Sequence, residues 1–260
     1  MRTLDEIVAL VENLAPPGLA ESWDNVGLLL GDRRRGVARV MACLTLTPPT
    51  VREAVERRAD LVVTHHPLPF RPLGRLTTDT TAGRLLLDLA AARVAVISPH
   101  TAFDSAPRGI NQLLAEGLAL RGITALVPRE PSAGSGRCGW LDSPMAPPEL
   151  AQRLKRLLAV ERVGMVGNDA QSLRMVGVAC GAADDLLPAA LAAGCDVLVL
   201  GEARFHTCLE AEANGMALLL AGHFATERFG VERLADELAA AMPDLEVWAA
   251  LSERDPIRWI

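Results

Sequence analysis

Two adjacent histidines, His65 and His66, end a short apolar run and are the strongest candidates for chemistry. The run from Asp60 to Thr64 is rich in branched residues, which is typical of a buried strand in a parallel sheet. Open α/β sheets bind ligands at the carboxyl ends of their strands, because the loops there leave a crevice. Two imidazoles at such an edge are candidate metal ligands, whereas an isolated pair of loop histidines would more often cap carbonyls or face water.

Two further strand-like runs each end in a histidine that a carboxylate follows four residues later. His100 precedes Asp104, and His223 precedes Glu227. If a helix begins at about residue 224 or 225, His223 and Glu227 lie on one face of its first turn. Simpler roles remain open for both carboxylates, because the positive end of a helix favours Glu227 and an isolated loop aspartate such as Asp104 is commonly a cap or turn residue.

These residues form a candidate metal site that contains three imidazoles, two carboxylates and no thiolate: His65, His66, Asp104, His223 and Glu227. Such a set suits a divalent ion such as Zn, Mn, Fe, Co or Ni. One four-coordinate ion would use at most four of the five ligands, so the set predicts two divalent ions bridged by carboxylate or hydroxide. A two-metal site lowers the pKa of bound water enough to make a nucleophile near neutral pH, with Glu227 or His100 as a candidate proton relay.

Five segments also carry a resemblance to a known family, and they occur in the family's order: Glu21 to Leu28, Thr64 to Leu68, His100 to Asp104, Gly201-Glu202 and Gly222 to Glu227. Over nearly its whole length the chain resembles the Nif-three-like dinuclear-metal hexameric proteins, the type 2 homologues of GTP cyclohydrolase I. The family's metal ligands fall on the same five residues. The resemblance implies a homo-hexamer and a metal-dependent hydrolase that acts on a nucleotide or phosphoester-like substrate, with ring opening of GTP and formate release as the family's activity.

The chain departs from the family at three positions: the family usually has an aspartate at the position of Thr45, an asparagine at that of Ala102 and often a histidine at that of Phe205. None of these departures removes a metal ligand, but they are expected to remove groups that orient ligands or substrate, a loss that commonly weakens metal affinity or activity about 10–100-fold. No Gly-x-x-x-x-Gly-Lys-Ser/Thr phosphate loop occurs. The alternative function is therefore a non-catalytic metal-binding or scaffolding protein, whose site would lack the open coordination position of an enzyme.

Composition limits the partners and the location. The chain has 260 residues, of which 50% are hydrophobic, enough for one large core or two modest ones. A net charge of −6 argues against nucleic-acid or anionic-membrane partners. The five cysteines are scattered, with no Cys-x-x-Cys pair, so neither a disulfide framework nor a zinc-thiolate site is expected. Without a leader pattern or an apolar stretch of membrane-spanning length, the cytoplasm is the expected location.

Strand-like and helix-like segments alternate, which predicts an α/β fold with right-handed crossovers and mainly parallel sheets. The segment 128–136 is rich in Pro, Ser and Gly and is the best internal boundary. We expect two interlinked α/β halves: residues 1–127, carrying His65, His66 and Asp104, and residues 137–260, carrying His223 and Glu227. The C-terminal elements could pack back on the first half. The ligands then come from both halves, which places the metal site in the cleft between them.

Local signals predict several helix starts and contacts. Thr3 to Glu6 has the form of a capping box at the head of the first helix. Thr78 or Asp79 is expected to cap a helix that runs to about residue 92. Glu202 and His206 are four residues apart near a helix start, and a local hydrogen bond between them is favoured over an outer contact to a metal ligand. Asp24 and Asn25 are candidates to line the site.

Overall fold

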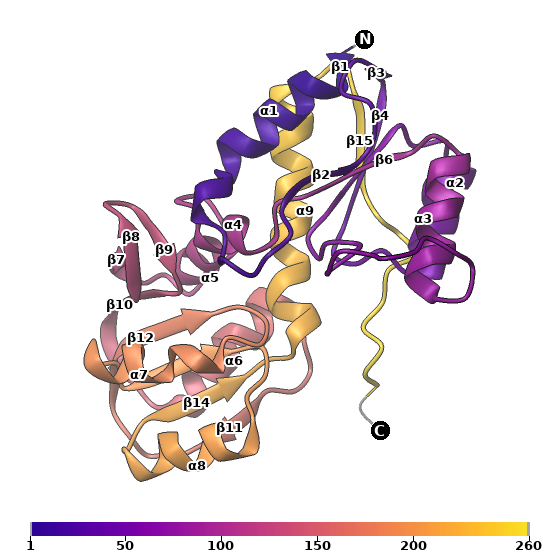
Figure 1. Ribbon diagram of the computed structural model, residues 1–260. Coiled ribbons are helices and arrows are strands. Elements are labelled where there is room, and N and C mark those ends of the chain that lie inside the picture. Colours follow the sequence, from indigo (N-terminus) through magenta and orange to yellow (C-terminus); the bar gives the residue numbers. More distant parts are fainter. Residues whose placement is uncertain (1, 259–260) are drawn as a thin grey trace. The chain divides into compact units, whose positions relative to one another are not determined.

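The computed structural model describes residues 2–258 and divides into two compact units (Figure 1). Unit 1 contains the residues up to Phe103 and those from Gly230 onward, and unit 2 is Asp104–Phe229. The chain passes from one unit to the other within α4 (His100–Ser105) and again within α9 (His223–Ala241).

Unit 1 is built on a five-stranded sheet in the order β15-β4-β5-β6-β2. Its strands are β15 (Glu246–Ala249), β4 (Arg39–Cys43), β5 (Leu61–Thr64), β6 (Ala95–Ser98) and β2 (Gly27–Leu30). The first four run parallel, and β2 is antiparallel to β6. The short strands β1 (Arg2–Thr3) and β3 (Gly36–Val37) pair separately.

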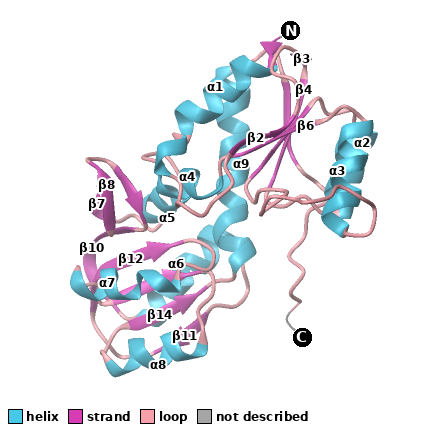
Figure 2. Ribbon diagram, viewed as in Figure 1, coloured by secondary structure: helices cyan, strands magenta, loops and turns pink. Residues whose placement is uncertain are grey.

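The central strands of unit 1 are buried on both faces, as expected of parallel strands between helices. Helices α2 (Pro48–Glu56) and α3 (Thr81–Ala91) lie on one side of the sheet, and α1 (Leu4–Leu14) lies on the other (Figure 2). Met41, Val62 and Val96 share one hydrophobic cluster with side chains of α2 and α3. This packing fixes the strands whose carboxyl ends carry His65, His66 and His100.

Unit 2 contains a six-stranded sheet in the order β11-β14-β13-β12-β10-β7. Its strands are β11 (Gly164–Val166), β14 (Ala217–Leu220), β13 (Val197–Leu200), β12 (Leu173–Ala179), β10 (Arg137–Met145) and β7 (Arg121–Thr124). The central three, β12, β13 and β14, are parallel, and the outer pairs are antiparallel. Its helices are α5 (Ile110–Gly117), α6 (Pro147–Leu158), α7 (Leu187–Ala192) and α8 (Phe205–Ala213). The predicted α/β class with parallel central strands is confirmed.

The structure differs from the expected division at residues 128–136. That segment lies inside unit 2, where β8 (Val127–Glu130) and β9 (Ala133–Ser135) pair as an antiparallel hairpin. The segment is therefore a hairpin rather than a linker: Pro131 lies in its turn, and Gly134, within β9, adopts a positive φ of 147°. The C-terminal segment returns to unit 1, because β15 pairs in parallel with β4.

The starts of α1 and α3 can be compared with the helix caps that the sequence predicts. The capping box at the head of α1 is confirmed, with the Thr3 side chain and the Glu6 side chain each accepting from the other's backbone N–H. The cap predicted for α3 is wrong: α3 begins at Thr81, and the Thr80 hydroxyl accepts from Gly83 N at 3.0 Å. Asp79 instead accepts a hydrogen bond from the Thr77 hydroxyl in the preceding loop.

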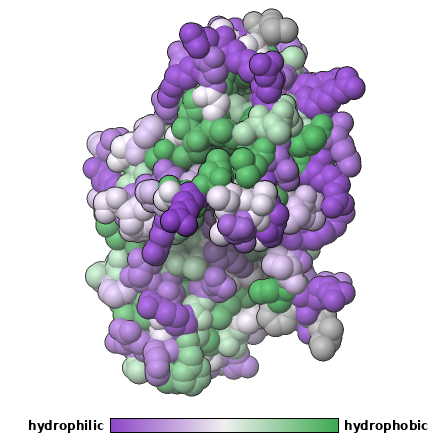
Figure 3. Space-filling model, turned by 45° about the vertical axis from the view of Figure 1, so that its right-hand side comes forward, coloured by the Kyte–Doolittle hydropathy of each residue, from purple (hydrophilic) through white to green (hydrophobic). Residues whose placement is uncertain are grey.

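Some large apolar side chains reach the surface. Figure 3 shows hydrophobic patches among hydrophilic side chains on one face of the molecule. Trp23 is 60% exposed and Phe205 is 72% exposed. None of the helices formed by residues 2–258 combines the length and the apolar composition that crossing a membrane would require.

Candidate metal-binding residues

In unit 1 the strand ends bring three histidines together. His65 and His66 follow β5, and His100 follows the neighbouring parallel strand β6 at the start of α4. Each ring offers a nitrogen that lies within 4.8 Å of a nitrogen of the other two. His65 and His100 are buried and His66 is partly exposed. Sequence reasoning treated His100 only as a proton relay, whereas the structure places it in the same cluster as His65 and His66.

A buried carboxylate holds His100. Asp24 Oδ1 lies 2.7 Å from His100 Nδ1, and Asp24 Oδ2 accepts hydrogen bonds from the backbone N–H and the hydroxyl of Thr101. Burial raises the pKa of Asp24, but the hydrogen bonds from His100 and Thr101 lower it more, to about 2. Asp24 therefore lies beside the histidine cluster as an ionised partner. Asn25 instead donates to Pro69 O at 2.7 Å and so fixes the loop that follows His66.

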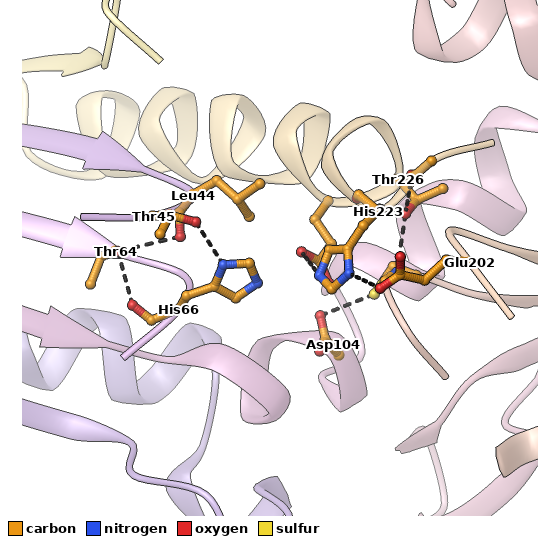
Figure 4. A network of polar contacts seen from close by, with 12 residues as sticks. Leu44, Thr45, Thr64, His66, Asp104, Glu202, His223 and Thr226 are labelled. Carbon is orange, nitrogen blue, oxygen red and sulfur yellow. Dashed lines mark hydrogen bonds and ion pairs between the residues drawn. The ribbon is translucent and has the colours of Figure 1, made fainter. Parts of the chain in front are cut away.

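Thr45 holds His66. Its hydroxyl oxygen lies 2.7 Å from His66 Nδ1, just beyond the end of β4 (Figure 4). The expectation that the Thr45 departure removes an orienting polar group is therefore wrong. The threonine side chain is shorter than an aspartate, but its hydroxyl contacts the His66 ring directly. Ala102 is a buried apolar residue of α4, and Phe205 is largely exposed at the start of α8.

In unit 2 the first turn of α9 aligns His223 and Glu227. The helix begins at His223 itself, and His223 Nε2 lies 3.0 Å from Glu227 Oε2. On the other side of the ring, His223 Nδ1 lies 2.9 Å from Glu202 Oε1 (Figure 4). The Glu227 hydrogen bond, opposed by burial and assisted by Glu202, raises the pKa of His223 to about 9. Glu202 thus contacts His223, and not the sequence neighbour His206 that we expected.

Asp104 lies within α4, so it is not a helix cap, and it is held by groups that the sequence did not point to. The Cys180 thiol donates to Asp104 Oδ1 at 3.2 Å, and the Asn111 side chain donates to Asp104 O at 3.1 Å. Burial and the carboxylates of Asp104 and Glu227 raise the pKa of Cys180, so the thiol stays protonated and can donate. No spacing signal marks Cys180, because its partner lies 76 residues away.

The loop after β12 also shapes the space around Glu227. Gly181 has a φ of +62°, and a Cβ added there would overlap Glu227 Oε1 and lie 3.3 Å from His223 Nε2. The absence of a side chain at Gly181 is therefore what lets the Glu227 carboxylate lie against this loop.

Three of these histidines share one arrangement. The Nδ1 atoms of His66, His100 and His223 each lie 2.7–2.9 Å from a side-chain oxygen. Metal-binding histidines characteristically fix one ring nitrogen in this way and present the other to the ion. Imidazole and carboxylate donors without thiolate also suit Zn and neighbouring divalent transition metals. The donor set in each unit therefore fits a metal-binding role.

Comparison with known proteins supports the resemblance. The family model for Duf34/NIF3 (NGG1p interacting factor 3) matches residues 2–256. A Clostridium perfringens protein named GTP cyclohydrolase 1 type 2 homolog is 30% identical over 260 residues, which cover 99% of each chain. A Streptomyces coelicolor protein of the same name is 37% identical over 235 residues, covering 87% of this chain and 82% of that protein. A crystal structure of a Bacillus cereus protein related to NIF3 has the same fold, with a TM-score of 0.90 and 22% identity over 100% of this chain and 99% of that one. A family match from residue 2 to residue 256 shows that this chain belongs to the Duf34/NIF3 family.

Proposed function

We propose that the protein binds two divalent metal ions through five residues and hydrolyses a small molecule with them: His65, His66, Asp104, His223 and Glu227. The observation that supports the proposal is the shared anchoring of Nδ1 in His66, His100 and His223, because metal-binding histidines characteristically fix one ring nitrogen in this way and offer the other to an ion. Two bound ions would supply Lewis acidity and an activated water.

The residues of the chain then have distinct tasks. Asp24 and Glu202 hold the rings of His100 and His223 through carboxylates, which strengthens an imidazole as a donor. His100 lies close enough to His65 and His66 either to share an ion or to move a proton. Cys180 orients Asp104 without itself being a thiolate ligand.

The names of the relatives supply the substrate class. Two similar bacterial proteins are named GTP cyclohydrolase 1 type 2 homolog, so we propose a nucleotide or phosphoester-like substrate. We further propose a homo-hexamer in the cytoplasm, without nucleic-acid or membrane partners, in keeping with the net charge of −6. A non-catalytic metal-binding or scaffolding protein is the second candidate. It is favoured by buried Ala102 and exposed Phe205, which offer a substrate no polar groups at these positions.

Metal content per chain tests the proposal. Protein purified without added metal or an affinity tag should contain about two ions per chain by elemental analysis, the number expected of a two-metal site. His65→Ala and Glu227→Ala should lower that number, whereas His206→Ala, which replaces an exposed histidine outside the set, should not. Wild-type protein that takes up no metal even after reconstitution would refute the proposal. Metal without turnover of nucleotides or phosphoesters would favour the scaffolding alternative.

A further inference from the structure

The C-terminal tail, which consists of the residues after β15, places a buried carboxylate next to residues 44 and 45, here called the Thr45 turn. Glu253 is 8% exposed and follows β15. Its Oε2 accepts from Leu44 N at 2.8 Å, and its Oε1 accepts from Thr45 N at 2.7 Å. One carboxylate therefore binds two successive backbone N–H groups, directly before the side chain that contacts His66.

A separate carboxylate anchors the same tail. Glu53 on α2 accepts from the backbone N–H groups of Leu251, at 3.0 Å, and Ser252, at 2.7 Å, and from the Trp248 indole at 3.1 Å. Glu53 thus fixes where the tail lies, whereas Glu253 is the tail residue whose side chain binds the Leu44 and Thr45 N–H groups.

We propose that Glu253 is a positioning residue for His66: it fixes the backbone of Leu44 and Thr45 so that the Thr45 hydroxyl accepts from Nδ1–H of His66. The ring is then held as the tautomer whose Nε2 carries no proton and is its donor atom. The proposal rests on the proposed function insofar as that donor atom is meant for a metal ion.

Because the threonine side chain is short, the contact of Glu253 with the backbone at Thr45 also controls the hydroxyl that holds the His66 ring. Threonine Oγ1 is bonded to Cβ, so its position follows directly from the backbone and a single χ1 angle. A turn that moves at Thr45 therefore moves Oγ1 by a similar amount, and a hydrogen bond of 2.7 Å tolerates little displacement. A bidentate, charge-assisted contact to two N–H groups is the strong kind that can hold such a turn.

The first experiment observes the ring without metal. In long-range ¹H–¹⁵N spectra of the metal-free full chain, at a pH where the ring is neutral, wild-type His66 should carry its proton on Nδ1. Glu253→Gln and Thr45→Val should both move the proton toward Nε2. Glutamine replaces one of the two carboxylate oxygens, each of which accepts from its own N–H group, with an NH2 group that cannot accept, and valine has no acceptor at all. Thr45→Ser should restore the wild-type tautomer.

The second experiment measures Co²⁺ affinity from the visible absorption of the full chain. Glu253→Gln should raise the Kd for Co²⁺ about tenfold or more. The double variant Glu253→Gln/Thr45→Val should bind no more weakly than Thr45→Val alone, because Glu253 acts through Thr45. Glu53→Gln is the matched control: it weakens the same tail without touching the Thr45 turn, so it should lower the melting temperature with a much smaller change in Kd.

The possible negative results distinguish a failure of the positioning role of Glu253 from a failure of the proposed function. An unchanged His66 tautomer in Glu253→Gln, additive losses in the double variant, or an equal loss of Co²⁺ affinity in Glu53→Gln would overturn the positioning role. Wild-type protein that binds no Co²⁺ would instead refute the proposed function, and the tautomer measurement on the metal-free chain would still decide the role of Glu253.

Discussion

Gly181→Ala is a direct test of the carboxylate and histidine pair in unit 2. The residue has a φ of +62°, which glycine adopts freely and alanine does not. The new methyl group would overlap Glu227 Oε1 and approach His223 Nε2 to 3.3 Å. Because Glu227 is buried, its carboxylate cannot simply swing into solvent and must leave its present position against the loop.

Two free-energy terms add up in this variant. The left-handed backbone costs about 1–2 kcal/mol for a residue with a Cβ. Overpacking a buried site costs about 1–3 kcal/mol more. Gly194→Ala separates the two terms, because Gly194 also has a positive φ, of +76°, but an added Cβ there meets nothing within 4 Å. The difference between the two variants should therefore be about 1–3 kcal/mol and belongs to the contact with Glu227.

Urea unfolding and metal content are the two assays for this pair of variants. Gly181→Ala should unfold more easily than Gly194→Ala by that difference. If Glu227 is a metal ligand, as we propose, Gly181→Ala should also lose bound metal, because the carboxylate is displaced. Gly194→Ala should keep the wild-type metal content. If Gly181→Ala matches Gly194→Ala in both stability and metal content, Glu227 is not held by the loop at Gly181 and the reasoning is refuted.

Two further predictions concern stability. Arg137→Met should lower the free energy of urea unfolding by about 3 kcal/mol or more, because the buried guanidinium donates to four backbone carbonyls and one amide side chain, and each buried acceptor left without a partner costs about 1–3 kcal/mol. A loss below about 1 kcal/mol would show that water replaces the guanidinium. Burial raises the pKa of Glu53, but hydrogen bonds from Ser252, Leu251 and Trp248 bring it below its usual value. A carboxylate whose pKa is lower in the folded state than its unfolded value of about 4.3 stabilises the folded protein at pH values above about 4.3. This stabilisation is lost as the pH falls through the folded-state pKa. Glu53→Gln should therefore destabilise at pH 7 and much less at pH 3, and an equal effect at both would contradict the assignment.

The sequence predicted the features that depend on neighbouring residues. Strand β5 was recognisable because a branched apolar run ends at His65 and His66, and the start of α1 because Thr3 and Glu6 have capping-box spacing. The pairing of His223 with Glu227 followed from helical geometry alone.

The groups that orient these residues were not predictable, because the fold brings them together across long stretches of chain. Asp24 meets His100 across 76 residues, and Glu253 meets Thr45 across 208. Hydrophobic periodicity contains no information about such polar pairs. Composition was misleading at residues 128–136, where Pro and Gly form a hairpin and not a linker between domains.

The Thr45 departure has a physical explanation in Glu253. A Thr45→Asp side chain would give His66 a carboxylate partner like those of His100 and His223, and a charged hydrogen bond stabilises by about 1.5–3 kcal/mol. However, Glu253 Oε1 already lies 2.7 Å from Thr45 N. If the new carboxylate is assumed to lie about 5 Å from that of Glu253, the two repel by about 3 kcal/mol at an effective dielectric constant of about 20.

A repulsion of that size equals or exceeds the gain, and the contact of the Thr45 hydroxyl with His66 is lost as well, so threonine is the compatible partner for this tail. In a double-mutant cycle measured by urea unfolding, Thr45→Asp should destabilise the chain that keeps Glu253, and Glu253→Gln should reverse that loss in the Thr45→Asp background while destabilising the wild type. A Thr45→Asp variant that is more stable than the wild type with Glu253 in place would show that the two carboxylates do not interact, and the departure at Thr45 would then need another cause.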